Sequence, residues 1–186
     1  AENAVLHGAG REDIDARMLG TGRPFILEVV APKTRSADLK QLEDEVNSET
    51  AGRVGVTFEG WAHRGEVETL KSKKAYKKYR IFVEVVGAIS LDELQSALDC
   101  LNGALIQQRT PHRVAHRRAD KVRERRVVAI ELVKAEDGRF LIDVVGEAGL
   151  YIKELISGDS GRTRPSLAEI LGREAHVTSL DVVLVE

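Results

Sequence analysis

The stretch RRVVAIELVKAEDGRFLIDVVG (residues 125–146) constrains the fold more than any other part of the sequence. Two runs in which apolar and polar residues alternate flank the tetrapeptide EDGR. Alternation with a period of two is typical of a strand with one buried face, and Asp-Gly is a strong signal for a tight turn. The stretch therefore predicts a β-hairpin, and with it an antiparallel part of a sheet.

Shorter patterns predict the other elements. Alternating or continuous apolar residues indicate strands at 24–31, 52–61, 79–88 and 179–186. Apolar residues at helical spacing indicate helices within 36–49, 90–102, 149–157 and 164–172. The expected helix caps are Ser36 for the first helix, a capping box of Ser90 and Glu93 for the second, and Ser166 and Gly172 for the two ends of the last.

This order of elements favours the α+β class. The strands are joined through a hairpin and short helices rather than through regular crossovers, so we expect a mixed, largely antiparallel sheet flanked by helices. A chain of 186 residues is long enough to bury a core. The sequence has no internal repeat and no persuasive linker, and one compact domain over residues 1–186 is the simplest prediction.

The charge of the chain is segregated. Although the formal net charge is only −2, residues 71–80 hold six basic residues and no acid, and residues 109–126 hold eight basic and two acidic residues. Two basic runs on an otherwise acidic chain indicate contacts with a polyanion, although two solvated faces are the simpler alternative. The residues expected to contact a nucleic acid are Lys77, Lys78, Arg113, Arg117 and Arg118.

Several classes of protein are not indicated. Cys100 is the only cysteine, which excludes an internal disulfide or a cysteine-rich zinc site within this chain and suits the reducing cytoplasm. We expect no membrane contact, because no apolar run approaches the roughly 20 residues that span a bilayer. The sequence has no phosphate-binding loop, no metalloprotease histidine spacing and no nucleophile elbow. His112 and His116 stand among arginines, which would repel a cation.

The segment GREDID (residues 10–15) is the first candidate site. Arg11 and Asp13 share a face if this segment is extended, and a guanidinium beside a carboxylate keeps the acid ionised and oriented. Such an aspartate can act as a nucleophile or a general base. A structural ion pair explains the same residues, and so does a magnesium site built from Glu12, Asp13 and Asp15.

Two tyrosines supply the other candidates. Tyr79 stands at the mouth of a strand within a basic run, where it could stack on a base or pack into the core. Tyr151 and Lys153 stand at the glycine-led start of the helix in 149–157, where both could reach one pocket. An amphipathic helix with an interfacial tyrosine is the alternative interpretation of this segment.

Taken together, these segments resemble a known family. GREDIDARMLGTGRPF, KKYRIFVEV, RTPHRVAHRRADKVRERR and GLYIKELISGDSGRTRPSLAEILG are similar, in this order, to segments of the archaeal tRNA pseudouridine(54/55) synthase family, which has eukaryotic relatives. The resemblance implies the pseudouridine synthase catalytic fold. It also implies a cofactor-free enzyme that isomerises T-loop uridines of tRNA, at position 54, position 55 or both, to pseudouridine.

The resemblance also implies roles for individual residues. GRED is similar to the G-R-x-D motif, which makes Asp13 the catalytic aspartate and Arg11 the motif arginine. KKYRIFV is similar to the K-x-Y-x-A-x-V strand, which makes Tyr79 the aromatic residue under the target base, and Ile81 replaces the motif alanine. GLYIKEL is similar to G-T-Y-I-R, with Tyr151 as a substrate contact and Lys153 as the cation facing the aspartate.

The family normally carries an N-terminal RNA-binding domain with a cysteine-rich zinc site, and nothing in this sequence matches it. The resemblance therefore implies that this chain is the catalytic half alone. Two other functions stay open from the residues. A non-catalytic RNA-binding domain would need Tyr79 and the basic runs but no convergence on Asp13, whereas a metal-dependent nuclease would need Glu12, Asp13 and Asp15 as ligands.

Overall fold

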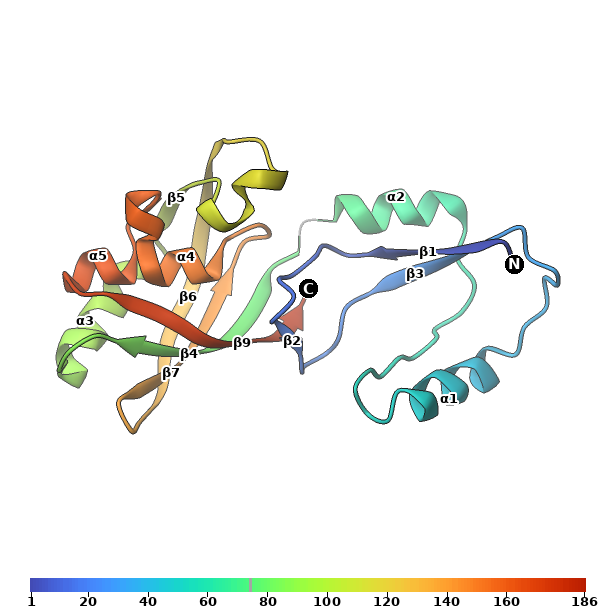
Figure 1. The fold of residues 1–186 in the computed structure, drawn as a ribbon, viewed down its shortest axis with the longest axis horizontal. Coiled ribbons are helices and arrows are strands. Elements are labelled where there is room, and N and C mark those ends of the chain that lie inside the picture. The colour runs from blue at the N-terminus through green and yellow to red at the C-terminus, as the bar shows by residue number, and fades with distance from the viewer. Residues whose placement is uncertain (74) are drawn as a thin grey trace. The chain divides into compact units, whose positions relative to one another are not determined.

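The computed structural model describes residues 1–73 and 75–186. In this described part, the chain forms two compact units rather than the single compact domain expected from the sequence. The N-terminal unit comprises Ala1–Arg11 and Pro24–Lys73, and the sheet unit comprises Glu12–Arg23 and Lys74–Glu186 (Figure 1). The loop with the candidate aspartate therefore belongs to the sheet unit, although the segments on both sides of it belong to the N-terminal unit.

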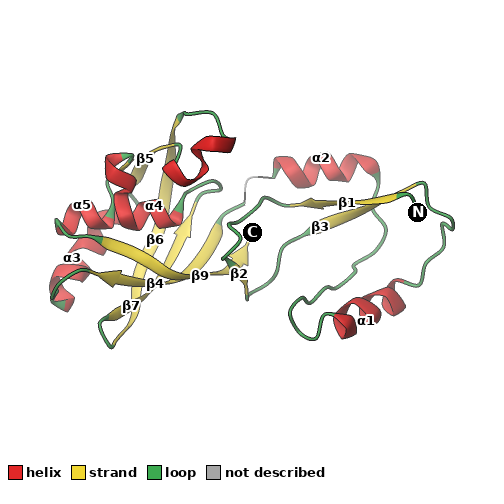
Figure 2. Ribbon diagram, viewed as in Figure 1, coloured by secondary structure: helices red, strands yellow, loops and turns green. Residues whose placement is uncertain are grey.

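The N-terminal unit is built on a two-stranded antiparallel sheet. Strand β1 (Asn3–Gly8) pairs with β3 (Phe25–Val30), from Asn3 opposite Val30 to Gly8 opposite Phe25. Two helices complete the unit, α1 (Leu39–Glu49) and α2 (Arg64–Ser72) (Figure 2). All their residues are at least partly exposed. Helix α1 starts later than predicted, because the carboxylate of Asp38, not the hydroxyl of Ser36, accepts the first backbone N–H groups.

The strand predicted at 52–61 is wrong. Its alternation of Val54, Val56 and Phe58 is real, but side chains of α1 bind its backbone in place of a neighbouring strand. The amide of Asn47 bonds both the N–H and the carbonyl of Val56, at 2.8 and 2.9 Å, and Glu43 accepts the N–H of Phe58 at 2.8 Å. An alternating pattern reports that one face of an extended segment is apolar, not that a partner strand exists.

The sheet unit contains the core. Its seven-stranded sheet, within the described residues, has the order β2-β9-β4-β7-β6-β5-β8, and all neighbours are antiparallel except β2 and β9. The strands are β2 (Arg17–Met18), β4 (Lys77–Val85), β5 (Leu105–Arg109), β6 (Val122–Glu136), β7 (Arg139–Gly146), β8 (Thr163–Arg164) and β9 (Ala175–Val185). The helices are α3 (Leu91–Leu101), α4 (Ile152–Ser157) and α5 (Leu167–Leu171), with the 3-10 segments η1 (His112–Arg117) and η2 (Gly158–Gly161).

The hairpin prediction is confirmed. Strands β6 and β7 pair from Glu136 opposite Arg139 at the turn to Val127 opposite Gly146. The turn residues Asp137 and Gly138 both have positive φ, 49° and 75°, as a two-residue hairpin that follows the twist of its strands requires.

The helix signals of the sheet unit are also confirmed. Ser90 and Glu93 form the capping box of α3, and Ser166 caps α5. The fully buried side chains of Ile81, Leu98, Ile142 and Leu155 join β4, α3, β7 and α4 in one hydrophobic cluster. Among the described residues, no helix has the length and apolar composition needed to cross a membrane.

Candidate active site

The loop that carries Asp13 is fixed to the sheet by the short strand β2. Arg17 and Met18 pair in parallel with Asp181 and Val182 of β9, and the Arg17 guanidinium donates two hydrogen bonds to Asp181, at 2.7 and 2.8 Å. Gly20 then passes so close to β9 that a Cβ atom on it would lie 1.7 Å from the carbonyl oxygen of Val183. The loop is therefore a bound part of the sheet unit and not a free connection.

Asp13 lies between two cations from distant parts of the sequence. Nη1 of Arg113 donates to its Oδ1 at 2.6 Å, and Nζ of Lys153 is 3.9 Å from its Oδ2. The Asp13 side chain is 25% exposed, so the carboxylate is held in place and can still be reached from solvent. Because Lys153 lies within ion-pair range, the structure brings this sequence-predicted pair together.

Arg113 joins several groups of this site. Its Nε and Nη2 donate to the buried carboxylate of Glu154, at 2.6 and 3.2 Å, while Nη1 donates to Asp13. The guanidinium carbon also lies 5.9 Å from the centre of the Tyr151 ring. Burial alone would lower the pKa of Arg113, but the hydrogen bonds and charges of Glu154 and Asp13 outweigh it, and the pKa is raised. We call Asp13, Arg113, Tyr151, Lys153 and Glu154 the Asp13 cluster.

Helix α4 positions its residues of this cluster through β5. The buried side chain of Gln108 donates to the carbonyl of Tyr151 at 2.9 Å and accepts the N–H of Tyr151 at 2.8 Å. Tyr151 precedes α4, and Glu154 follows three residues later, on the same side of one helical turn. The side chain of one glutamine thus fixes the start of the helix that faces Asp13.

Lys153 is shared between two aspartates. Its ammonium donates to both oxygens of Asp15, at 2.6 and 2.8 Å, and is farther from Asp13. The hydrogen bond from Lys153 is the main reason why the pKa of Asp15 is lowered. Lys153 therefore supplies positive charge to Asp13 without bonding it directly in this structure.

Glu12 belongs to a second ionic group, which we call the Glu12 cluster: Glu12, Arg23, Lys77 and Tyr79. Nη2 of Arg23 donates to Glu12 at 2.7 Å, the ammonium of Lys77 forms a short ion pair with the same carboxylate, and the Tyr79 hydroxyl donates to it at 3.4 Å. Lys77 is buried, and the Tyr79 side chain belongs to the hydrophobic core with an exposure of 3%. Burial, with the charge of Glu12 adding to it, raises the pKa of Tyr79.

Several predicted residues are placed differently from their expected roles. Lys77 is not on an open basic surface, because it is buried against Glu12, and the ammonium of Lys78 lies 2.9 Å from Asp143. Tyr79 offers no open ring face in this structure, since core residues cover it. Arg11 belongs to the N-terminal unit with an exposed side chain, and its support of Asp13 stays a prediction.

In the second basic run, Arg117 and Arg118 are exposed, as expected. Lys74, part of the first basic run, lies outside the described residues.

The sequence did not indicate two members of the Asp13 cluster: Arg113 was expected only as a nucleic-acid contact, and Glu154 was not among the candidate site residues. The spacing of Tyr151 and Glu154 could have indicated a shared helix face, but nothing in the run of arginines singles out Arg113 as the partner of Asp13.

The magnesium hypothesis has no geometric support among the described residues. No three histidine, cysteine, aspartate or glutamate side chains in this part of the chain come together as a metal site. Glu12 faces Arg23 and Lys77, whereas Asp13 and Asp15 face Arg113 and Lys153. The three carboxylates therefore bind cationic side chains instead of converging on one point.

Comparison with known families assigns the chain. The family model described as "Pus10, C-terminal" matches residues 1–186, the whole chain. The chain belongs to the Pus10 C-terminal family. Proteins named tRNA pseudouridine synthase Pus10 are similar along nearly all of it: 53% identical over 97% of this chain in Methanothermobacter marburgensis, 50% over 98% in Methanothrix thermoacetophila and 49% over all of it in Archaeoglobus fulgidus. The predicted family is thereby confirmed.

The chain spans only about half the length of these curated relatives, between 40% and 51% of the three named above. Among solved structures, one chain of a Cbf5–Nop10–Gar1 complex matches with a TM-score of 0.51 and 28% identity. The match covers 60% of this chain and 31% of that chain. It confirms the predicted fold, a mixed and mostly antiparallel sheet flanked by helices, as found in pseudouridine synthases.

Proposed function

We propose that this chain is the catalytic part of a tRNA pseudouridine synthase and that Asp13 is its reactive carboxylate. The observation that carries the proposal is the Asp13 cluster. It brings together a loop of the opening segment, an arginine 100 positions later and a tyrosine and a lysine of the α4 segment. A protein that only binds RNA needs basic and aromatic surfaces, but it has no use for a partly exposed aspartate held by residues this far apart.

The reaction defines what the site must do. In the isomerisation, the bond between N1 of uracil and the sugar breaks, the base turns, and C5 forms the new bond to the same sugar carbon, while C5 releases its proton and N1 takes one up. An ionised carboxylate can attack the sugar carbon, or it can remove a proton from the sugar to start the departure of the base. Both routes need a carboxylate that is aimed at the sugar, and the Arg113 hydrogen bond at 2.6 Å orients Asp13.

Arg113 also explains how Asp13 keeps its direction. Two of its nitrogens are bound by the buried Glu154, so the guanidinium plane is set before RNA arrives. Its third nitrogen then presents a single donor to Asp13. This division leaves Oδ2 of Asp13 facing Lys153 at 3.9 Å, a longer and more adaptable contact.

We assign the tyrosines to the target uridine, which must leave its stack to react. Tyr151 is only partly buried and carries the Arg113 guanidinium beside its ring, so it can contact the base in the present structure. Tyr79, the residue expected beneath the base, can stack only after its ring is uncovered. We therefore propose that core residues move off the Tyr79 ring when RNA binds, that the Glu12–Tyr79 contact opens in the same step, and that Arg11 supports Asp13 in that state.

The proposed substrate is tRNA, at T-loop position 54, position 55 or both, and the proposed location is the cytoplasm. The exposed Arg117 and Arg118 of the second basic run are the proposed phosphate contacts, together with Arg113 at the edge of the site. No cofactor enters the proposed reaction, since every group that it needs is a side chain of this protein. Residues 1–186 as a whole are the proposed catalytic region.

A tritium-release assay tests the proposal. With enzyme in excess over tRNA that carries tritium at C5 of uridine, the chain should release the label in the course of one turnover. Asp13→Ala should abolish release and leave tRNA affinity within a few-fold. Asp15→Ala is the matched control, because it removes a carboxylate that also contacts Lys153 but is far more exposed, and its effect should be milder. An Asp13→Ala enzyme within a few-fold of wild type would refute the assignment, and binding without release by the wild-type chain would support an RNA-binding domain.

A further inference from the structure

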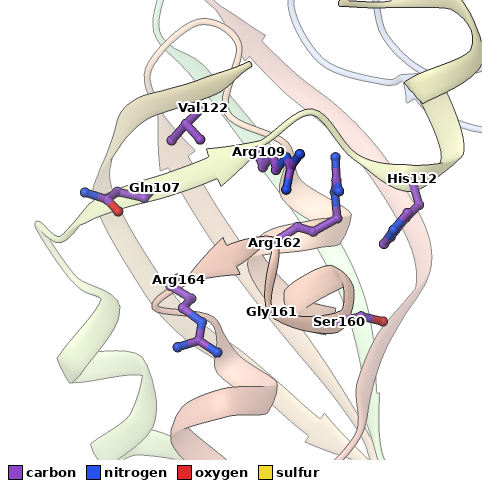
Figure 3. Close-up of a pocket in the computed structure, with 8 residues that line it drawn as sticks. All are labelled: Gln107, Arg109, His112, Val122, Ser160, Gly161, Arg162 and Arg164. Atoms are coloured by element: carbon purple, nitrogen blue, oxygen red, sulfur yellow. The ribbon is translucent and has the colours of Figure 1, made fainter. Parts of the chain in front are cut away.

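A second basic site lies on the sheet unit, outside the Asp13 cluster. It is an open pocket of about 480 Å³ between β5, η1, η2 and β8 (Figure 3). Eight described residues line it, among them Gln107, Arg109, His112, Gly161, Arg162 and Arg164. Three of them are arginines and none is acidic. We propose that this pocket binds a backbone phosphate of the RNA substrate, an inference that rests on the proposed function for the identity of the RNA.

The backbone brings the three arginines together. Strand β5 pairs with β8, with Gln107 opposite Arg164, and the N–H of Arg109 donates to the carbonyl of Arg162 at 2.8 Å. Gly161 has a φ of 84°, and a Cβ atom there would lie 3.2 Å from Nη2 of Arg164. A glycine at this position therefore lets the Arg164 guanidinium lie directly against the chain.

One carboxylate is shared by two of the guanidiniums. Arg109 donates to both oxygens of Asp120, from Nε at 3.0 and 2.9 Å and from Nη2 at 2.5 Å, and Nη2 of Arg162 donates to Asp120 at 2.9 Å. The hydrogen bond from Arg109 is the first cause of the lowered pKa of Asp120, which stays ionised. Arg162 also donates to the carbonyl of Thr110, at 3.0 and 2.7 Å. Among the described residues of the pocket, Asp120 thus binds Arg109 and Arg162 but not Arg164, so Arg164 is the arginine that this carboxylate does not engage.

The other neighbouring carboxylates form only loose ion pairs with the arginines. Glu169 is 3.7 Å from Arg164, and Asp159 is 3.8 Å from Arg162, and neither distance is that of a good hydrogen bond. Asp159 instead accepts from the backbone of His112 at 2.9 Å and lies 3.1 Å from its ring. The guanidinium fork matches the oxygens of a phosphate, so Arg164, with a side chain 68% exposed, is the readiest contact.

The pocket and the Asp13 cluster share one segment of the backbone, η1. His112, at its edge, is followed directly by Arg113, the partner of Asp13, and both belong to η1. A phosphate held in the pocket would therefore fix the RNA chain relative to the segment that orients Asp13. This is the geometry needed to hold the backbone while one nucleotide turns out of its stack.

The test measures binding of tRNA to the 186-residue chain across a salt series, in the Asp13→Ala background, so that the result does not depend on turnover. Arg164→Gln should weaken binding about threefold to tenfold and reduce the log–log salt slope by about 0.7–0.9. Arg164→Lys keeps the charge and should keep the slope. Arg139→Gln is the matched control: Arg139 is an exposed arginine at the β6–β7 turn, stacked on Phe82, and its loss should change neither value.

Neutral linkages identify the source of the phosphate. A series of T-arm RNAs is made in which one backbone phosphate at a time is replaced by an uncharged methylphosphonate. At one position, the replacement should weaken binding to the wild-type chain as much as Arg164→Gln does. The same replacement should not weaken binding to the Arg164→Gln variant any further. If no linkage behaves in this way, or if the variant matches Arg139→Gln, the proposal is overturned. Binding of inorganic phosphate to the variant is measured separately by NMR titration. The proposal is also overturned if Arg164→Gln weakens the binding of inorganic phosphate but leaves tRNA affinity and the salt slope of tRNA binding equal to those of Arg139→Gln.

Discussion

Two neighbouring residues of one loop, Glu12 and Asp13, have very different surroundings. In the Glu12 cluster the carboxylate is 16% exposed, and its partners Arg23 and Lys77 are 15% and 8% exposed. In the Asp13 cluster the carboxylate is 25% exposed, and Arg113 and Lys153 are 33% and 25% exposed. Both acids are paired with two cations, but one set is shielded and the other can be reached from outside.

The difference shows that an ion pair alone says little about function. Glu12 ties the loop to β4, since its partner Lys77 begins that strand and Tyr79 lies in the core. The side chain of Asp13 instead pairs with Arg113 and Lys153, which are partly exposed to solvent. We therefore expect changes around Glu12 to act on stability and changes around Asp13 to act on rate.

The largest effect after loss of Asp13 itself should come from Arg113. Arg113→Lys keeps a positive charge but cannot bond Glu154 and Asp13 at the same time, so we expect the single-turnover rate to fall by about 10²-fold. Arg117→Lys, an exposed change in the same run, is the control and should stay close to wild type in rate. A rate within threefold of wild type for Arg113→Lys would mean that Asp13 does not need its partner.

The next effect should be on stability, from Lys77→Met. Removing the ammonium leaves Glu12 with Arg23 alone beside a buried tyrosine, which should cost about 1–3 kcal/mol of unfolding free energy. Urea unfolding measures it. Lys134→Met removes an exposed ion pair at the hairpin and should change the unfolding free energy by less than about 0.5 kcal/mol. Equal stability of both variants would make the Glu12 cluster energetically unimportant.

Tyr79 belongs to the Glu12 cluster and is also the proposed stacking residue, so its variants should separate the role of the hydroxyl from that of the ring. Tyr79→Phe keeps the packed ring and loses a long hydrogen bond, for which we expect about 1 kcal/mol or less in stability. Tyr79→Leu should remove about 1–3 kcal/mol of base stacking and show this in the chemical step more than in tRNA affinity. Unfolding must be measured beside the rate, because the ring is also core. Normal turnover by folded Tyr79→Leu would remove the residue from the substrate site.

The smallest effect should come from the exposed second basic run. Replacing Arg117 and Arg118 together with alanine should reduce the log–log salt slope of tRNA binding by about two if both contact phosphate. Stability and single-turnover rate at saturating enzyme should not change. An unchanged slope would place this run away from the RNA.

The sequence predicted the elements of the sheet unit better than those of the N-terminal unit. In the sheet unit, local chemistry decides local structure: Asp137-Gly138 makes the hairpin turn, and Ser90 with Glu93 begins α3. In the N-terminal unit, the pattern at 52–61 predicted a strand, but Asn47 and Glu43, residues from elsewhere, bind that backbone. Side-chain partners nine and fifteen positions away are not visible in the alternation of a segment.

The site shows the same limit at single residues. The convergence of Asp13 with Lys153 and Tyr151 was predictable only through the motifs that place them in a known family. Lys77 and Arg113 both stand in basic runs, yet one is buried in an ion pair and the other orients the aspartate. Their charges alone could not separate these roles, because burial is set by tertiary packing.

The most direct measurement compares Asp13→Asn with Glu12→Gln in the tritium-release assay, at equal concentrations of folded enzyme and with urea unfolding of each. Both changes keep shape and remove one negative charge. We predict that Asp13→Asn loses at least about 10³-fold in single-turnover rate with a change in unfolding free energy below about 1 kcal/mol. Glu12→Gln should be less stable but stay within about tenfold of the wild-type rate. An active Asp13→Asn beside an inactive, stably folded Glu12→Gln would contradict the account.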